Sequence, residues 1–310
     1  MNNSILLLKK DVDLRIPLID ELTVDPVPVG SALMVEFDPT SQWYAASMAI
    51  AAGWLRTGGT VTYSVNAQPP DSVRTQFRRL GLDVPALEKD ERLVIFDGYT
   101  VTLGRKSNEK YAAQSLKAAD LSITYSREVM QAGPVPELLT IVDNVSTLAR
   151  FNDERAWIEF LLTRGIPSAF LTKSTTIAGI ITGVHPDSVY KQLEAAADGV
   201  IDLKLDAASD PPRNLIRIRS MRNIRFDGRW REIKPGENFD ITLKPQSTTG
   251  RSLYIVRIIF LNTNLLKFFR VRPEFVRFAH FRCSKLMLAR RGEHASLPPQ
   301  RVCALPFAGQ

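Results

Sequence analysis

The chain has 310 residues, of which 45% are hydrophobic and 24% are charged, and its formal net charge is +7. This composition is typical of a globular protein and argues against wholesale disorder. The sequence has two cysteines and no uncharged apolar run of about 18 residues, so neither a disulfide framework nor a membrane-spanning helix is expected. We therefore expect a cytoplasmic protein.

Short apolar runs bounded by turn residues are the predicted strands, and the longer periodic segments between them are the predicted helices. In chain order, the predicted strands are 31–37, 59–66, 92–98, 137–144, 168–173, 199–205, 214–221 and 239–243. The predicted helices are 42–58, 71–82, 108–131, 152–165 and 185–197. Asp71 and Asn152 are predicted N-caps, whereas Gly81 and Gly165 are predicted helix ends.

The order of these elements predicts the class of fold. The first strands lack strict alternation of apolar and polar residues, which indicates parallel strands buried on both faces. Strands that alternate with helices predict an α/β domain with a mostly parallel sheet. The later strands, within 214–243, are expected to be antiparallel and to extend one edge of that sheet. Ligands of such sheets bind at the carboxyl ends of the strands.

Five segments then occur in an order that resembles the KaiC-like branch of the RecA-fold ATPases, over roughly residues 15–244. They are VPVGSALMVEF (27–37), GGTVTYSVNAQPPDSVRTQFRRLGLDV (58–84), ELLTIVDNVSTLARF (137–151), AAADGVIDLKLD (195–206) and RNLIRIRSMRNIRFDGRWREI (213–233). The resemblance implies a RecA-like sheet of the P-loop NTPase type, flanked by helices. It also implies an ATP site after the first strand, with Mg²⁺ as the accompanying ion.

The phosphate loop of that family reads Gly-x-x-x-x-Gly-Lys-[Ser/Thr], and its backbone N–H groups and lysine hold the phosphates. The corresponding segment here is FDPTSQWY (37–44), which has neither glycine nor lysine. Side chains at the two glycine positions block close approach of a phosphate to the backbone, and Pro39 removes one N–H donor. A carboxylate at Asp38 that faced the cradle would repel a phosphate. We therefore predict a degenerate Walker A motif.

Other residues of the family's site are also replaced. The glutamate pair that follows the second strand and orients or deprotonates the attacking water corresponds to Ala67 and Gln68, and neither can act as a general base. Asp143 is retained at the position that helps to hold Mg²⁺, although we favour the interpretation that it caps the following turn. Of the family's Lys-x-Arg-Gly pattern, which reaches the ATP of a neighbouring subunit, Arg222 alone remains.

The sequence thus predicts a vestigial nucleotide site. We expect Trp43 and Tyr44 to fill the vacated cavity by packing, in preference to stacking on a base. Catalysis is assigned to no residue and no cofactor is expected, but binding of ATP and Mg²⁺ in an altered pose stays open, through aromatic stacking and Asp143. The candidate binding residues are Asp38, Thr40, Ser41, Gln42, Trp43, Tyr44, Asp143 and Arg222.

The last fifth of the chain differs in composition, which predicts two domains, 1–244 and 245–310. From Pro245 to Gln310 there are 11 Lys and Arg residues, two acidic residues and seven of the 15 phenylalanines. This basic C-terminal extension has three interpretations: an arm that binds nucleic acid, an interfacial helix over 254–269 on an acidic membrane surface, or an extension without a selected function.

These observations lead to one main hypothesis of function and two alternatives. The main hypothesis is a catalytically inactive KaiC/RecA-like homologue with a regulatory or scaffolding role, which associates with itself or with an active RecA-like homologue. The first alternative is an ATPase or phosphotransferase with an unusual phosphate cradle. The second is a RecA-like protein that binds nucleic acid through 245–310.

Overall fold

The computed structural model describes residues 15–236 and 240–245, without the side chains of 128–132. These residues form a ten-stranded sheet in the order β10-β9-β8-β7-β1-β6-β5-β2-β3-β4. The strands are β1 (Ala32–Phe37), β2 (Thr60–Val65), β3 (Leu93–Asp97), β4 (Tyr111–Ala112), β5 (Leu138–Val142), β6 (Thr175–Ile181), β7 (Gly199–Asp206), β8 (Arg213–Met221), β9 (Arg231–Pro235) and β10 (Ile241–Leu243).

Strands β7, β1, β6, β5, β2, β3 and β4 are parallel, and β8, β9 and β10 extend the β7 edge as antiparallel strands. The predicted α/β fold with a mostly parallel sheet is therefore confirmed, and so is the antiparallel extension over the later strands. No helix in the described part of the chain has the length and apolar character that crossing a bilayer requires.

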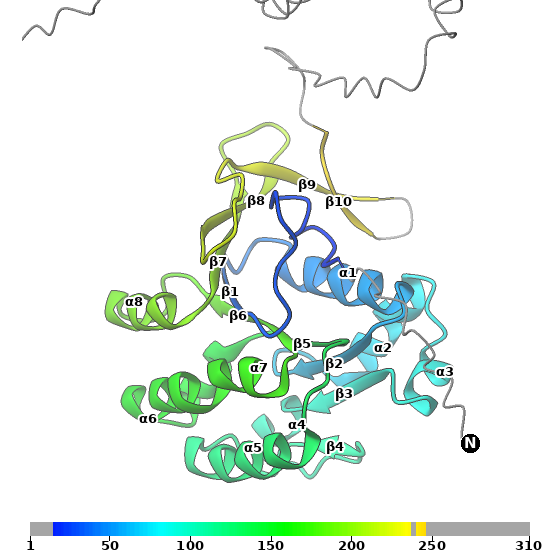
Figure 1. The fold of residues 1–310 in the computed structure, drawn as a ribbon, viewed down its shortest axis with the longest axis vertical. Helices are drawn as coiled ribbons and strands as arrows, with labels where there is room; N and C mark the ends of the chain where they lie inside the picture. Colours follow the sequence, from blue (N-terminus) through cyan, green and yellow to red (C-terminus); the bar gives the residue numbers. More distant parts are fainter. Residues whose placement is uncertain (1–14, 237–239, 246–310) are drawn as a thin grey trace, which may run out of the picture. The chain divides into compact units, whose positions relative to one another are not determined.

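Helices cover both faces of the sheet (Figure 1). On one face, α1 (Trp43–Arg56), α2 (Pro70–Arg79) and α3 (Val84–Lys89) pack on a large apolar core. On the other face lie α5 (Ala118–Ala132), α6 (Glu154–Phe160), α7 (Ile166–Thr172) and α8 (Asp187–Ala196) over a second core. Three short helical segments complete the fold: α4 (Tyr99–Thr102), the 3₁₀ segment η1 (Val145–Arg150) and the π-helical segment η2 (Leu161–Gly165).

The helix predicted over 71–82 is confirmed as α2, and Val73, Phe77 and Leu80, which recur at helical spacing, are all buried. Gly81 has a φ of +78° just after the helix, as a C-terminal glycine should. The predicted N-caps are wrong by a few residues: Pro69 and Asp153 occupy these positions. The long helix predicted over 108–131 is shorter than expected, since Tyr111–Ala112 pairs with β3 and α5 begins at Ala118.

The strand predicted over 168–173 is wrong, and this error has a clear physical cause. The helical path from Glu154 continues through η2 and α7 to Thr172, so Gly165 does not end it. A short apolar run such as SAFL fits a strand and a buried helix equally well. The strand that occupies this place in the sheet is β6, which lies between β1 and β5 in the centre. Except for Pro245, the extension predicted over 245–310 lies outside the described residues.

Candidate functional site

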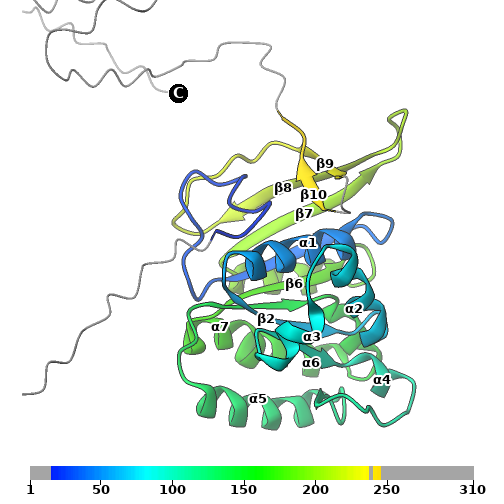
Figure 2. The same cartoon turned by 90° about the vertical axis from the view of Figure 1, so that its right-hand side faces the viewer.

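Strands β1, β6, β5 and β2 are parallel neighbours, so their carboxyl ends lie along one edge of the sheet. Most of the predicted site residues follow β1 or β5 at this edge, and α1 lies on the near side of the sheet in Figure 2. The turn over 38–42 follows β1 and leads into α1. Asp143 follows β5 and contacts the turn after β2. Trp43 links the two places, because its indole Nε1–H donates to the carbonyl oxygen of Asp143 at 2.7 Å.

The backbone N–H groups of the turn are the decisive feature, because a phosphate loop holds its ligand with free N–H groups. Pro39 has no N–H, and the other four residues of 38–42 donate theirs within the chain. The acceptors are the carbonyl of Leu203, the carboxylate of Asp38, the carbonyl of Asp38 and the side chain of Asn214, at 2.7 to 3.0 Å. The turn therefore has no free N–H group to offer a phosphate.

Asp38 itself takes the place of an anion in this turn. Its Oδ1 accepts both the N–H of Thr40, at 2.7 Å, and the Thr40 hydroxyl, at 2.5 Å. Ser41 donates its hydroxyl to the Asp38 carbonyl at 2.6 Å. The carboxylate thus lies within the turn, where its negative charge would repel an incoming phosphate.

Trp43 fills the space beneath the turn. Its side chain is 1% exposed, and its ring stacks on Phe37 with centroids 5.8 Å apart. Gly179 on β6 makes this position possible, because a Cβ atom there would lie 2.3 Å from the indole Nε1. The predicted packing role of Trp43 is confirmed. Tyr44 is only half-buried, contacts Phe37 edge to face and accepts a hydrogen bond from the Asn144 side chain at 3.3 Å.

Asp143 is fully buried, and its carboxylate holds the turn after β2. The N–H of Asn66 donates to Oδ1 at 2.8 Å, and that of Ala67 donates to Oδ2 at 3.2 Å. Burial raises the pKa of Asp143 to about 6, although these two hydrogen bonds act against the shift. The prediction that Asp143 caps the following turn is wrong. Asn144 caps that turn, by accepting the N–H of Ser146 at 2.9 Å.

These residues do not fit a magnesium ion. Mg²⁺ prefers ionised, accessible carboxylates and several further oxygen ligands. Asp143 has no exposed surface, and both of its oxygens already accept backbone hydrogen bonds. Within 15–236 and 240–245, no cluster of three His, Cys, Asp or Glu residues could hold a metal ion. Ala67 and Gln68 likewise place no carboxylate where a general base would stand.

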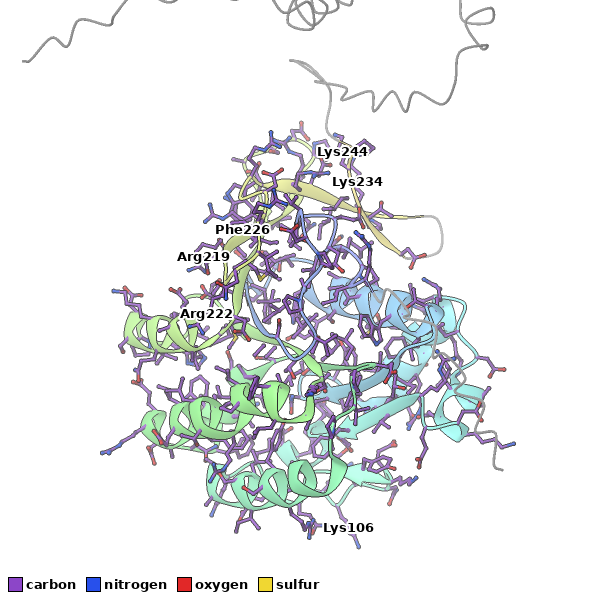
Figure 3. The ribbon with its side chains drawn as sticks, in the orientation of Figure 1. Lys106, Arg219, Arg222, Phe226, Lys234 and Lys244 are labelled. Atoms are coloured by element: carbon purple, nitrogen blue, oxygen red, sulfur yellow. The ribbon has the colours of Figure 1, made fainter. Side chains whose placement is uncertain are left out.

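Arg222 is the one predicted site residue that the fold sets apart. It follows β8, beside the start of β7 and thus at the opposite end of β7 from the turn, and extends toward α8 (Figure 3). There it donates to the carbonyl oxygens of Ala195 and Ala196 and lies 3.9 Å from Asp198. In the chain it therefore satisfies the carboxyl end of α8.

Comparison with known proteins identifies the family of the chain. The family model described as "ATPase: KaiC" matches residues 47–237, which is more than half of the chain. The chain belongs to the KaiC ATPase family. The fold is also similar to that of a KaiC-like protein from the hyperthermophilic archaeon Pyrococcus horikoshii OT3, with a TM-score of 0.56 and 20% sequence identity over 75% of this chain and 97% of that one. No curated protein sequence matches.

The predicted KaiC-like, RecA-type fold is thus confirmed. The match to the KaiC family begins three residues after Tyr44, so the turn over 38–42 lies outside the matched segment.

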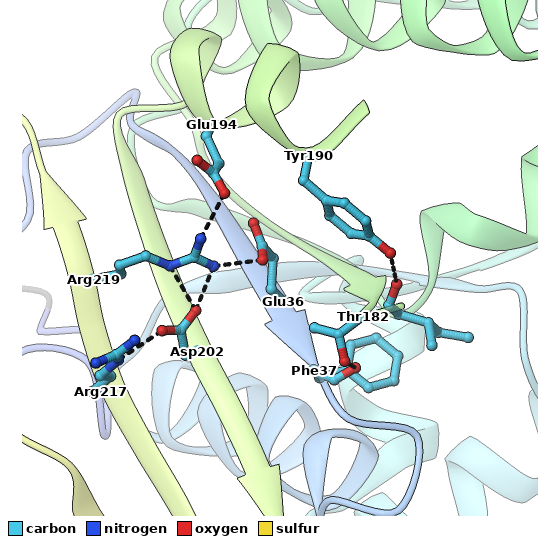
Figure 4. Close-up of polar contacts among 9 residues, drawn as sticks. Glu36, Phe37, Thr182, Tyr190, Glu194, Asp202, Arg217 and Arg219 are labelled. Carbon is cyan, nitrogen blue, oxygen red and sulfur yellow. Dashed lines mark hydrogen bonds and ion pairs between the residues drawn. The ribbon is translucent and has the colours of Figure 1, made fainter. Parts of the chain in front are cut away.

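Sequence reasoning missed a charged network beside this site (Figure 4). Arg219 contacts Glu36 and Asp202 at 2.5 Å and Glu194 at 2.6 Å, and Arg217 contacts Asp202 at 2.7 Å. Glu36 is 7% exposed, and burial raises its pKa to about 7 against the opposing effect of Arg219. The signal was a glutamate within the apolar strand SALMVEF. In this KaiC-family chain the network joins β1, β7, β8 and α8.

Proposed function

We infer that this KaiC-family chain has lost ATP hydrolysis and works as a regulatory or scaffolding protein through contacts with itself or with an active RecA-like homologue. The observation that carries the proposal is the state of the turn over 38–42, where each available N–H group is donated within the chain. A phosphate could bind to the N–H groups of 38–42 only after these hydrogen bonds were broken.

Three further features support the loss of activity. Trp43 occupies the space under the turn, and Asp38 presents negative charge toward it. Asp143 is held by backbone N–H groups in an environment that disfavours its ionised form. No carboxylate stands at Ala67 or Gln68. ATP turnover requires that the charge on the phosphates be stabilised and that a water molecule be oriented. Trp43, Asp38 and Asp143 work against the first requirement, and the lack of a carboxylate at Ala67 and Gln68 works against the second.

The expected result of an ATP assay on the full chain is an absence of saturable heat in calorimetric titration with Mg-ATP, and no phosphate release above that of buffer. The matched control is Tyr44→Ala, which opens the accessible edge of the site. Phosphate release that disappears in the Tyr44→Ala protein would overturn the proposal, since the site would then be active. If release is equal from both proteins, gel filtration decides its source: activity that elutes apart from the chain is a contaminating ATPase, and activity that elutes with the chain overturns the proposal.

Helix α7 offers a surface for the proposed association. Phe170 and Leu171 are 78% and 60% exposed, and such large apolar side chains are commonly covered by a partner when several are contiguous. We expect wild-type protein to self-associate in sedimentation velocity. Phe170→Ser should weaken the free energy of this association by at least about 2 kcal/mol, as for an aromatic residue at the centre of an interface.

The control for that experiment is Ile123→Ser, which changes a side chain on α5 that is 71% exposed. It should leave self-association unchanged. Equal weakening by the two substitutions, or none by Phe170→Ser, would contradict the role of α7. A wild-type chain that remains monomeric at every concentration would direct the same test to mixtures with an active homologue.

A further inference from the structure

A cavity of about 340 Å³ lies on the face of the sheet opposite Trp43 and α1. Its floor is formed by β1, β6, β5 and β2, and its roof by α5, α7 and η2. Protein interiors contain few voids larger than a water molecule, so a space of this size is not ordinary packing. It falls within the range of small-molecule pockets, about 300 to 1,000 Å³.

The floor carries a row of hydroxyl groups in register. Thr62 on β2 pairs with Thr140 on β5, and Thr140 pairs with Thr176 on β6. All three side chains are half-buried and line the cavity. In the described part of the chain their hydroxyl groups have no hydrogen-bond partner. Because these side chains border the cavity and are only half-buried, a ligand there can form hydrogen bonds with their hydroxyl groups.

The walls are largely apolar. Leu121 and Tyr125 from α5, Leu161 from η2 and Ile166 from α7 face the same space as the threonines. Among the lining residues whose side chains the structure describes, none is Asp, Glu, Lys, Arg or His. Beside these residues an ionised ligand would lose hydration without gaining an opposite charge, which favours an uncharged molecule.

We propose that this cavity binds an uncharged, largely apolar small molecule that places a hydrogen-bonding group against the row of Thr62, Thr140 and Thr176. The site is separate from the turn over 38–42 and does not depend on whether that turn binds a phosphate. Apolar surface provides the affinity, and the hydroxyl row fixes the orientation of the ligand. The floor is built from central strands, so the row is held in a rigid part of the fold.

The probe for the test is Nile red, an uncharged fluorescent dye whose carbonyl oxygen can accept a hydrogen bond from a threonine hydroxyl. Titration of the full chain should give a saturable rise in fluorescence with one site per chain. Two substitutions that fill the cavity, Thr140→Leu and Ala178→Leu, should each weaken this binding by at least about tenfold, the equivalent of 1.4 kcal/mol. The matched control is Thr242→Leu, on the exposed side of β10, which should leave the affinity unchanged.

A third variant separates volume from hydrogen bonding. Thr140→Val keeps the shape of the side chain but removes its hydroxyl, and it should weaken Nile red by roughly fivefold, as for one neutral hydrogen bond. Circular dichroism verifies that each variant is folded. If Thr140→Leu does not fold, Ala178→Leu and Thr140→Val decide whether the dye binds in this cavity. Dye that binds elsewhere on the chain, including 246–310, should bind equally to all variants, so differences between variants report on the cavity. The proposal is overturned if the wild type shows no saturable binding, or if the filling variants bind as tightly as Thr242→Leu.

Discussion

Replacement of Trp43 by alanine is expected to lower the free energy of unfolding by about 3 to 5 kcal/mol, the range for large aromatic residues removed from a core. The side chain is 1% exposed and stacks on Phe37, and its indole N–H donates to the carbonyl of Asp143. The substitution would therefore leave a cavity and a buried carbonyl without its donor. Urea unfolding, analysed with a constant dependence on denaturant concentration, measures the change.

Two control variants separate the causes of that loss. Trp43→Phe keeps most of the apolar contact but removes the N–H, and it should cost about 1 to 3 kcal/mol. Tyr44→Ala removes a half-buried neighbour on the same helix and should cost less than Trp43→Ala. A loss below about 1 kcal/mol for Trp43→Ala would be far under the range for a buried aromatic, and would show that Trp43 is not part of the core.

Trp43→Ala also tests what closes the phosphate site. The N–H groups of 38–42 are held by Asp38, Leu203 and Asn214, none of which contacts the indole in the interactions described above. Opening the space under the turn should therefore leave ATP binding absent. If Trp43→Ala gained saturable Mg-ATP binding, the aromatic ring alone would be the obstacle, and the hydrogen bonds of the turn would be secondary.

The fold could be predicted from the sequence where the periodic signal was long. Helix α2, with Val73 and Phe77 on its buried side, and the buried strands around it belong to this group. Prediction failed where an apolar run was too short to distinguish helix from strand, as over 168–173. That failure also hid the row of threonines on the cavity floor, because Thr176 belongs to β6, which was not predicted.

The sequence names the candidate site residues but does not reveal their hydrogen-bond partners. Local sequence showed that the turn over 38–42 lacks the glycines and lysine of a phosphate loop. It could not show that the N–H of Gln42 is donated to Asn214, because the two residues are 172 positions apart. The partners of Asp143 were missed for the same reason, since Asn66 is 77 positions away. Contacts of this range depend on the order of the strands, which the sequence pattern does not specify.

The second large effect concerns pH, and Asp143 is its source. Burial raises the pKa of this carboxyl in the folded chain to about 6, above its ordinary value of 3.8. A group with a raised folded pKa favours the folded state most below pH 3.8, and this stabilisation is lost as the pH rises through 6. A shift of this size corresponds to about 3 kcal/mol. Wild-type protein should therefore lose stability between about pH 4 and pH 6.5.

Asp143→Asn is the variant that isolates this effect. It removes the ionisable group and keeps an oxygen that can accept the N–H of Asn66, although the N–H of Ala67 loses its acceptor at every pH. The variant should start from lower stability at pH 4 and then lose less as the pH rises. Glu36, whose pKa burial raises to about 7, titrates in both proteins, so the difference between the two unfolding profiles reports on Asp143.

The sign of this difference distinguishes the two interpretations of Asp143. A carboxylate arranged to hold Mg²⁺ would be stabilised in its ionised form, its pKa would be lowered, and the folded chain would gain stability as the pH rises above 4. A buried carboxyl that joins two turns behaves in the opposite way, as its contacts with Asn66 and Ala67 indicate. Equal pH profiles for wild type and Asp143→Asn would contradict the raised pKa. A wild-type stability that rises above pH 4 relative to Asp143→Asn would return Asp143 to the list of candidate metal ligands.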